Sequence, residues 1–153
     1  MRLLLDEQLD TREGHVADAL NGLGQRNGLT FRAFHKDRPR LKMTDPEVVE
    51  YCRDNDFDAL ISFNHKDFGK KKALYRDLVA CGVSVVVLRP PEEPAFRPER
   101  QAALLFQHLR CIAKHLDETP LLGPILLKLT ATECVQRTLQ ELEDEFAGKR
   151  RLP

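Results

Sequence analysis

The sequence carries no excess of either charge and no long apolar run. Its 24 basic and 24 acidic residues cancel, so the chain lacks the global positive field that marks many nucleic-acid binders. A polyanionic partner would therefore need a local basic patch. The opening "MRLLLDEQ" has only three consecutive apolar residues, too few for the core of a signal peptide or for a membrane span. Hence we expect a soluble protein that is not exported.

Cysteine is scarce, and its spacing excludes the common paired motifs. Cys52, Cys81, Cys111 and Cys134 are widely separated, form no CxxC pair and fall within apolar patterns. This arrangement predicts reduced, mostly buried thiols, and with them a cytoplasmic location.

The sequence also lacks internal repeats and low-complexity tracts. A chain of 153 residues with 42% hydrophobic content suits one compact domain, which would bury roughly two-thirds of its unfolded surface. We place this single domain at residues 1–147 and expect residues 148–153 to form a frayed tail.

Short apolar runs alternate with amphipathic segments along the chain. The runs at residues 3–5, 29–34, 59–63, 83–88 and 124–129 predict strands, because they are brief and mostly rich in β-branched or aromatic side chains. Helices are predicted between and after these runs. The first two helices are indicated by an apolar face at Val16, Ala19, Leu20 and Leu23 before Gly24, and by a capping box from Thr44 to Glu47. The next two are expected at residues 71–80, before Gly82, and along an apolar stripe from Pro98 to Leu116. The last is indicated by a second capping box, Thr130 with Glu133, which precedes the apolar residues Val135, Leu139, Leu142 and Phe146.

This alternation predicts an α/β fold with helices on both faces of one sheet. The expected architecture is a three-layer sandwich whose central, mainly parallel sheet has about five strands. We expect the strand at residues 3–5 to lie inside the sheet, next to the strand at residues 59–63, because its apolar run is almost unbroken. Sheets of this kind bind ligands outside the carboxyl ends of their strands.

Polar residues follow these two strands at the edge where ligands bind. Asp6 comes directly after the first strand, and Asn64 and Asp67 come just after the third. Neighbouring strands are about 4.8 Å apart, so these side chains would lie close together. Asp45 and Glu47 begin the helix that precedes the third strand, and could bring a further carboxylate to the same edge.

Converging carboxylates need a cation. Two negative charges about 5 Å apart repel by roughly 3 kcal/mol at an effective dielectric constant near 20. Mg²⁺ and Mn²⁺ prefer oxygen ligands, and they leave coordination positions for water and substrate phosphates. Metal-assisted phosphodiester hydrolysis is the reaction that such a site suits.

Four segments carry a resemblance to a known family. "MRLLLDEQL", "TDPEVVEYC" and "DALISFNHKDFG" followed by "GVSVVVLRP" resemble the PIN-like nucleases, in the order in which that family shows them, over roughly residues 1–90. The resemblance implies a PIN-like sandwich and a ribonuclease that uses Mg²⁺ or Mn²⁺ to cleave single-stranded RNA. It also implies a role as the toxin of a toxin–antitoxin pair.

The resemblance also implies roles for individual residues. Asp6 would be the first metal-ligand carboxylate, and Asp67 the one after the later strand. Asp45 would be the middle acid, with Glu47 and Glu50 as competitors. Asn64 would complete the catalytic set, at a position where many members of the family have aspartate.

We expect two basic segments, residues 36–42 and 69–72, to be solvent-exposed loops in the absence of other evidence. If both flank the ligand-binding edge, they supply the positive patch that an RNA backbone needs. The RNA-binding residues expected on this basis are Lys66, Lys70, Lys71, Lys72, Arg38 and Arg40.

Simpler structural roles stay open for the same residues. Asp6 could be a helix N-cap, and Asp45 is also explained by the start of its helix. Asn64 and Asp67 could form an Asx turn. We interpret His65 as solvent-facing.

Two histidines further along the chain share a helical face. His108 and His115 are seven residues apart, two turns of the helix, so together they cannot bind one ion without other ligands.

The alternative function is a catalytically inactive PIN-like module that binds protein or RNA. Asn64, and Gln8 where the family more often has Asn, would leave fewer charges at the site. A receiver-like signalling domain is a weaker alternative, because it needs an Asp where this chain has Asn64 and a Lys at the end of its last strand, whereas Lys128 lies within the final apolar run. The partners expected are an RNA substrate and an antitoxin protein, with a homodimer left open and no membrane.

Overall fold

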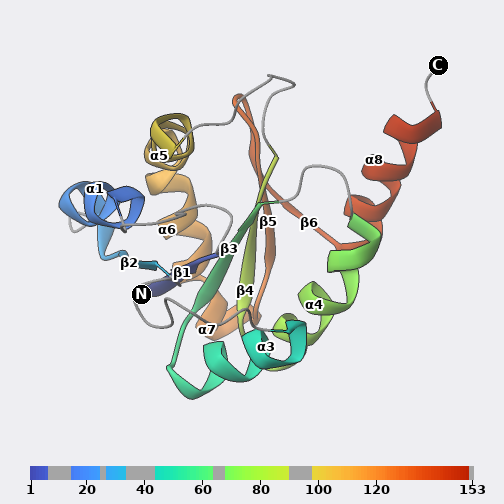
Figure 1. Cartoon of the computed structure of the whole chain (residues 1–153), viewed down its shortest axis with the longest axis horizontal. Helices are drawn as coiled ribbons and strands as arrows, with labels where there is room; N and C mark the ends of the chain where they lie inside the picture. Colours follow the sequence, from blue (N-terminus) through green and yellow to red (C-terminus); the bar gives the residue numbers. More distant parts are fainter. Residues whose placement is uncertain (7–14, 25–26, 34–43, 64–67, 90–97, 152–153) are drawn as a thin grey trace.

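The computed structural model describes residues 1–6, 15–24, 27–33, 44–63, 68–89 and 98–151 (Figure 1). A six-stranded sheet forms its centre. In spatial order the strands are β2 (Thr30–Ala33), β1 (Arg2–Leu5), β3 (Ala59–Phe63), β4 (Ser84–Leu88), β5 (Leu126–Leu129) and β6 (Cys134–Arg137).

The strands from β2 to β5 are parallel, and β6 runs antiparallel to β5. The predicted mainly parallel sheet is therefore confirmed, and so is the pairing of β1 with β3, in which Leu4 lies opposite Leu60. The sequence analysis expected about five strands, and β6 is the additional one.

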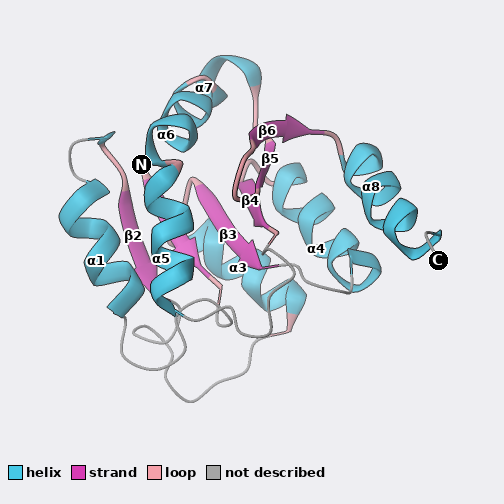
Figure 2. Cartoon of the chain, turned by 90° about the horizontal axis from the view of Figure 1, so that it is seen from above, coloured by secondary structure: helices cyan, strands magenta, loops and turns pink. Residues whose placement is uncertain are grey.

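Helices cover both faces of the sheet and complete a three-layer sandwich (Figure 2). One face carries α1 (His15–Gly24), α5 (Pro98–Gln107) and α6 (Leu109–Asp117), and the other carries α3 (Asp45–Asp54), α4 (Phe68–Ala80) and α8 (Leu139–Arg151). The short α7 (Thr119–Leu122) precedes β5.

Strand β1 contributes to both hydrophobic cores. Leu3 and Leu5 pack in the core on the α1 face, whereas Leu4 packs in the core on the α3 face, and all three side chains are fully buried. Burying one such side chain stabilises the fold by about 1.5–3 kcal/mol. Burial on both faces is the reason for the unbroken apolar run, as expected for an interior parallel strand.

Strands β5 and β6 form a hairpin whose turn spans residues 130–133, so the predicted second capping box is wrong. Thr130 Oγ1 accepts hydrogen bonds from the backbone N–H groups of Thr132 (3.3 Å) and Glu133 (3.0 Å), and the Thr130 N–H donates to the Glu133 carbonyl (2.9 Å). These bonds close the turn between β5 and β6. A threonine oxygen bonded to the N–H three residues later occurs in turns as well as in helix caps, which explains the error.

The N-cap of the last helix lies eight residues after the predicted one, at Thr138 instead of Thr130. Thr138 precedes α8, and its Oγ1 accepts a hydrogen bond from the Glu141 N–H (3.1 Å), as an N-cap does. The helix then continues to Arg151, so helical backbone extends beyond residue 147, where we expected a frayed tail to begin.

Two other helices differ in detail from their predictions. The expected helix from Pro98 to Leu116 is divided into α5 and α6 at His108, whose φ of −108° and ψ of 10° depart from helical values. In α1, Ala17 is buried and Ala19 is exposed, so the buried face of this helix includes Ala17 in place of the Ala19 that we assigned to it.

Two of the four cysteines are not free thiols. Cys111 and Cys134 form a disulfide, with their Cα atoms 6.5 Å apart, and Cys52 and Cys81 are free. The prediction of four reduced thiols is therefore wrong for this pair. These two cysteines no longer support the inference of a reducing compartment.

Within the described parts of the chain, every helix is too short or too polar to cross a membrane.

Candidate functional site

Asp6 lies at the carboxyl end of β1, where the sheet has a topological switch point. β1 has β2 on one side and β3 on the other, so the chain adds its second strand on one side and its third on the opposite side. Open parallel sheets bind ligands in the crevice outside such a point. The Asp6 N–H donates a hydrogen bond to the Ile61 carbonyl (3.0 Å), which holds Asp6 against β3.

The Asp6 side chain lies on the α3 face of the sheet and pairs there with a lysine of α4. Side chains alternate along a strand, so Asp6 shares a face with Leu4. The Nζ of Lys71, in the first turns of α4, lies 3.7 Å from Oδ2 of Asp6, and the two side chains are 25% and 16% exposed. A carboxylate that loses most of its water in this way is costly without a nearby positive charge, which Lys71 provides.

The thiol of Cys52, on α3, is close enough to be influenced by the same carboxylate. Burial, followed by the charges of Cys81 and Asp6, raises the pKa of Cys52 to about 12. The thiol is therefore protonated at neutral pH, which excludes Cys52 as a nucleophile at this site.

The acidic residues of α3 lie on its exposed surface. Asp45 and Glu47 belong to its first turn, and Thr44 Oγ1 donates to Glu47 Oε1 (3.0 Å). This bond joins two side chains, and the Thr44 side chain makes no bond to the helix backbone, so the contact differs from the predicted capping box. Among the described residues, Asp6, Asp45 and Glu47 are not brought together as a group of three potential metal ligands.

Several predicted site residues lie outside the described residues. These are Asn64, Asp67, Lys66, Arg38 and Arg40, together with the side chain of Lys70.

The two remaining basic candidates make ion pairs in the structure. Lys71 pairs with Asp6, and Lys72 pairs with Glu143 of α8 at 2.5 Å. Lys72 thus joins α4 to α8, whereas Lys71 lies at the switch point beside Asp6.

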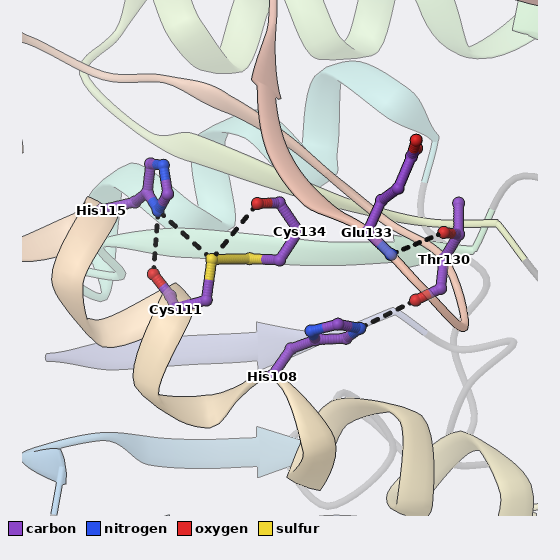
Figure 3. The surroundings of a disulfide bond; sticks show 6 residues. All are labelled: His108, Cys111, His115, Thr130, Glu133 and Cys134. Atoms are coloured by element: carbon purple, nitrogen blue, oxygen red, sulfur yellow. Dashed lines mark hydrogen bonds between the residues drawn. A yellow bond between two sulfur atoms is a disulfide. The ribbon is translucent and has the colours of Figure 1, made fainter.

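A second group of potential ligands joins α6 to β6 (Figure 3). Ligand atoms of Cys111, His115 and Cys134 all lie within 4.8 Å of one another, and each residue is half-buried. His115 Nδ1 lies 2.9 Å from the Cys111 carbonyl oxygen and 3.5 Å from Cys111 Sγ. His108, on the same helix face, points instead to the Thr130 carbonyl, 2.8 Å from its Nε2.

A charge cluster around the buried Lys128 ties α8 to the sheet, and its other members are partly exposed. Lys128 Nζ lies 2.8 Å from Glu145 Oε2 and 3.1 Å from Glu133 Oε2, while Arg137 Nε lies 2.9 Å from Glu145 Oε1. Burial alone would raise the pKa of Glu145, but hydrogen bonds and charges from Lys128 and Arg137 outweigh it and lower this pKa. Lys128 is thereby a structural residue of the β5–α8 contact.

Comparisons with known proteins add no functional argument. No family model matches the chain, and no curated protein matches it. A thermophilic tryptophan halogenase (Th-Hal) from Streptomycin violaceusniger matches over 97% of this chain and 95% of its own, with 13% sequence identity and a TM-score of 0.34. A similarity this low bears on neither fold nor activity.

Sequence reasoning located Asp6 but missed two features, its contact with Lys71 and the separate group at α6 and β6. It treated Lys71 as a residue for RNA, and it left Cys111, His115 and Cys134 unconnected. The spacing of Cys111 and His115, four residues apart on a helix, was a usable signal for one side of that group. Cys134 carried no such signal, because its segment was predicted to be helical.

Proposed function

We propose that this chain is a PIN-like endoribonuclease that uses Mg²⁺ or Mn²⁺ to cleave single-stranded RNA. The observation that carries the proposal is the position of Asp6: a largely buried carboxylate at the switch point, bonded through its backbone to β3 and accompanied by a cationic group. The resemblance of the segments around Asp6, Asp45 and Asp67 to PIN-like nucleases supports the same assignment.

The donor chemistry of this edge fits a hard divalent cation. Asp6 offers carboxylate oxygens as ligands. The ammonium group of Lys71 lies beside them, so this place in the fold accepts a positive charge. Asp67, Asn64 and either Asp45 or Glu47 would supply the other oxygen ligands. When bound, the ion would activate a water molecule and neutralise charge on the phosphoryl group.

The protein's own residues would bind and orient the RNA. Basic side chains contact phosphates without reading sequence, which suits a positive patch formed by Lys71 with Lys66, Lys70, Lys72, Arg38 and Arg40. We further propose that the chain is the cytoplasmic toxin of a toxin–antitoxin pair, and that an antitoxin protein holds it in check.

The second candidate is an inactive PIN-like module that binds RNA or protein. The ion pair between Lys71 and Asp6 favours it, because a lysine that neutralises the carboxylate makes a metal ion unnecessary for folding. Asn64 in place of an aspartate would lower the charge of the site in the same direction.

Cleavage of labelled single-stranded RNA, with and without Mn²⁺, tests the first candidate against the second. We expect Mn²⁺-dependent cleavage, and a rate at least about a hundredfold lower in Asp6→Asn, because losing one charged ligand removes several kcal/mol of stabilisation at 1.36 kcal/mol per factor of ten. Asp67→Asn should behave in the same way, and His65→Ala should have little effect.

Asp77→Asn is the matched control. Asp77 lies on α4 with its side chain 52% exposed, so the same chemical change occurs away from the switch point. Cleavage that survives in Asp6→Asn would refute the assignment of the site. A preparation that binds Mn²⁺ but cuts no RNA would favour the inactive module.

A further inference from the structure

We propose that the reduced chain binds zinc through Cys111, Cys134 and His115. The three ligand atoms already lie within 4.8 Å of one another. Two ligands come from successive turns of α6 and the third from β6, so the ion would join the helix to the edge strand of the sheet (Figure 3).

The backbone separation suits a metal site as well as a disulfide. The Cα atoms of Cys111 and Cys134 are 6.5 Å apart. Two thiolates that bind one tetrahedral zinc ion at 2.3 Å lie roughly 3.8 Å from each other, a spacing that side-chain rotation can reach at this Cα separation. All three residues are half-buried, so an ion can reach them while losing part of its water.

The ligand chemistry selects a soft or borderline cation. Two thiolates and one imidazole favour zinc, whereas Mg²⁺ and Mn²⁺ prefer oxygen ligands. The group is also remote from Asp6, because β1 and β6 are separated by four strand spacings, about 19 Å. Zinc at this position is therefore independent of the proposed nuclease site.

His115 presents its Nδ1 to the sulfur atom of Cys111. Its Nδ1 faces Cys111 Sγ at 3.5 Å and lies 2.9 Å from the Cys111 carbonyl oxygen. In the disulfide form, a proton on Nδ1 would allow His115 to donate a hydrogen bond to the Cys111 carbonyl oxygen. In the zinc form the ring proton would reside on Nε2, which leaves the Nδ1 lone pair for the ion.

The two neighbours most able to complete a four-residue set are engaged elsewhere. His108 Nε2 contacts the Thr130 carbonyl (2.8 Å), and the Glu133 carboxylate pairs with Lys128 (3.1 Å). Figure 3 shows both side chains pointing away from the sulfur atoms. The fourth zinc position would therefore be held by water, as in zinc sites with three protein ligands.

Zinc binding and the disulfide exclude each other. A thiol reductant supplies two electrons and two protons to the disulfide and leaves as its own disulfide, and Cys111 and Cys134 become thiols. Zn²⁺ then binds the two thiolates, and the two thiol protons are released to water.

Zinc titration of the full chain, with a phosphine reductant present, tests the proposal. We expect one zinc ion per reduced chain, and none in the oxidised chain. Cys111→Ser, Cys134→Ser and His115→Ala should each weaken binding by at least about tenfold, the lower end of the loss seen when only an outer-sphere partner of a metal ligand is removed. Cys81→Ser is the matched control, since Cys81 is a free, partly buried cysteine that packs against the core on the α3 face.

Thiol alkylation of the wild-type chain gives a readout that needs no variant to fold. With zinc present, Cys111 and Cys134 should be protected from alkylation, whereas the labelling of Cys81 should not change. Absence of protection, or equal zinc binding by the wild type and Cys134→Ser, would overturn the proposal. Unchanged affinity in His115→Ala would overturn the three-ligand assignment.

Discussion

The Nζ of Lys71 lies 3.7 Å from Oδ2 of Asp6, so the carboxylate at the switch point of the sheet has a lysine of α4 beside it. If Asp6 also binds a divalent cation, Lys71 and the ion would compete for the same negative charge. Charges of +1 and +2 about 5 Å apart repel by about 1.7 kcal/mol even at the dielectric constant of water.

We therefore predict that Lys71→Gln binds Mn²⁺ roughly tenfold more tightly than the wild type, because 1.4 kcal/mol corresponds to a factor of ten. Calorimetric titration with MnCl₂ would measure this change. Lys72→Gln is the control, since Lys72 pairs with Glu143 instead of Asp6. Equal affinities in the wild type and both variants would mean that no metal competes with Lys71.

A buried hydrogen bond lies next to this site. The hydroxyl groups of Ser62 and Tyr75 are 2.8 Å apart, and both side chains are fully buried. Tyr75→Phe should lower the free energy of unfolding by about 1–3 kcal/mol, because the Ser62 hydroxyl loses a partner in a place that water cannot reach.

Urea unfolding of the single and double variants measures this bond. We expect Ser62→Ala combined with Tyr75→Phe to cost less than the sum of the two single substitutions, because the second removes a group that the first has already left without its partner. Strict additivity would show that the two hydroxyl groups do not stabilise each other.

Glu145 should make the stability of the fold sensitive to acid. Its pKa is lowered in the folded chain, so the ionised group stabilises the fold above its unfolded-state pKa, about 4.5. This contribution is lost as the pH falls through the lower, folded-state value. Glu145→Gln should therefore lower the free energy of unfolding by about 1 kcal/mol at pH 7, because solvent screens this partly exposed group, and the difference from the wild type should shrink below about pH 4.5.

Urea titrations at pH 7 and pH 3 would test this pH dependence. Glu118→Gln is a suitable control, because Glu118 is exposed. A difference between Glu145→Gln and the wild type that is the same at both pH values would contradict the expected role of the charge.

The disulfide should stabilise the oxidised chain. Cys111 and Cys134 are 23 residues apart, and closing a loop of that length in the unfolded chain is worth about 3 kcal/mol in the chain-entropy model. Unfolding in EDTA, which removes any contribution from zinc, should show this loss in Cys111→Ala combined with Cys134→Ala. Cys81→Ala should keep the stabilisation, and equal stability of the oxidised wild type and the double variant would contradict it.

The order of β1 to β5, their alternation with helices and the position of Asp6 after β1 follow from the sequence alone, whereas the segment of β6 was predicted to be helical. These features depend on local patterns: short apolar runs between turn signals favour strands, and Leu3 to Leu5 are buried on both faces of the sheet. The same reasoning correctly predicted that β1 pairs with β3, because a run with no polar face belongs inside the sheet.

Which distant side chains meet follows from the packing of the elements. Thr130 and Glu133 have the spacing of a helix cap and of a hairpin turn alike, and it is the pairing of β6 with β5 that selects the turn. That pairing also brings Cys134 to Cys111. In the same way, the packing of α4 on the sheet places Lys71 beside Asp6. Contacts between separate elements depend on how those elements pack against one another, and local sequence patterns do not predict this packing.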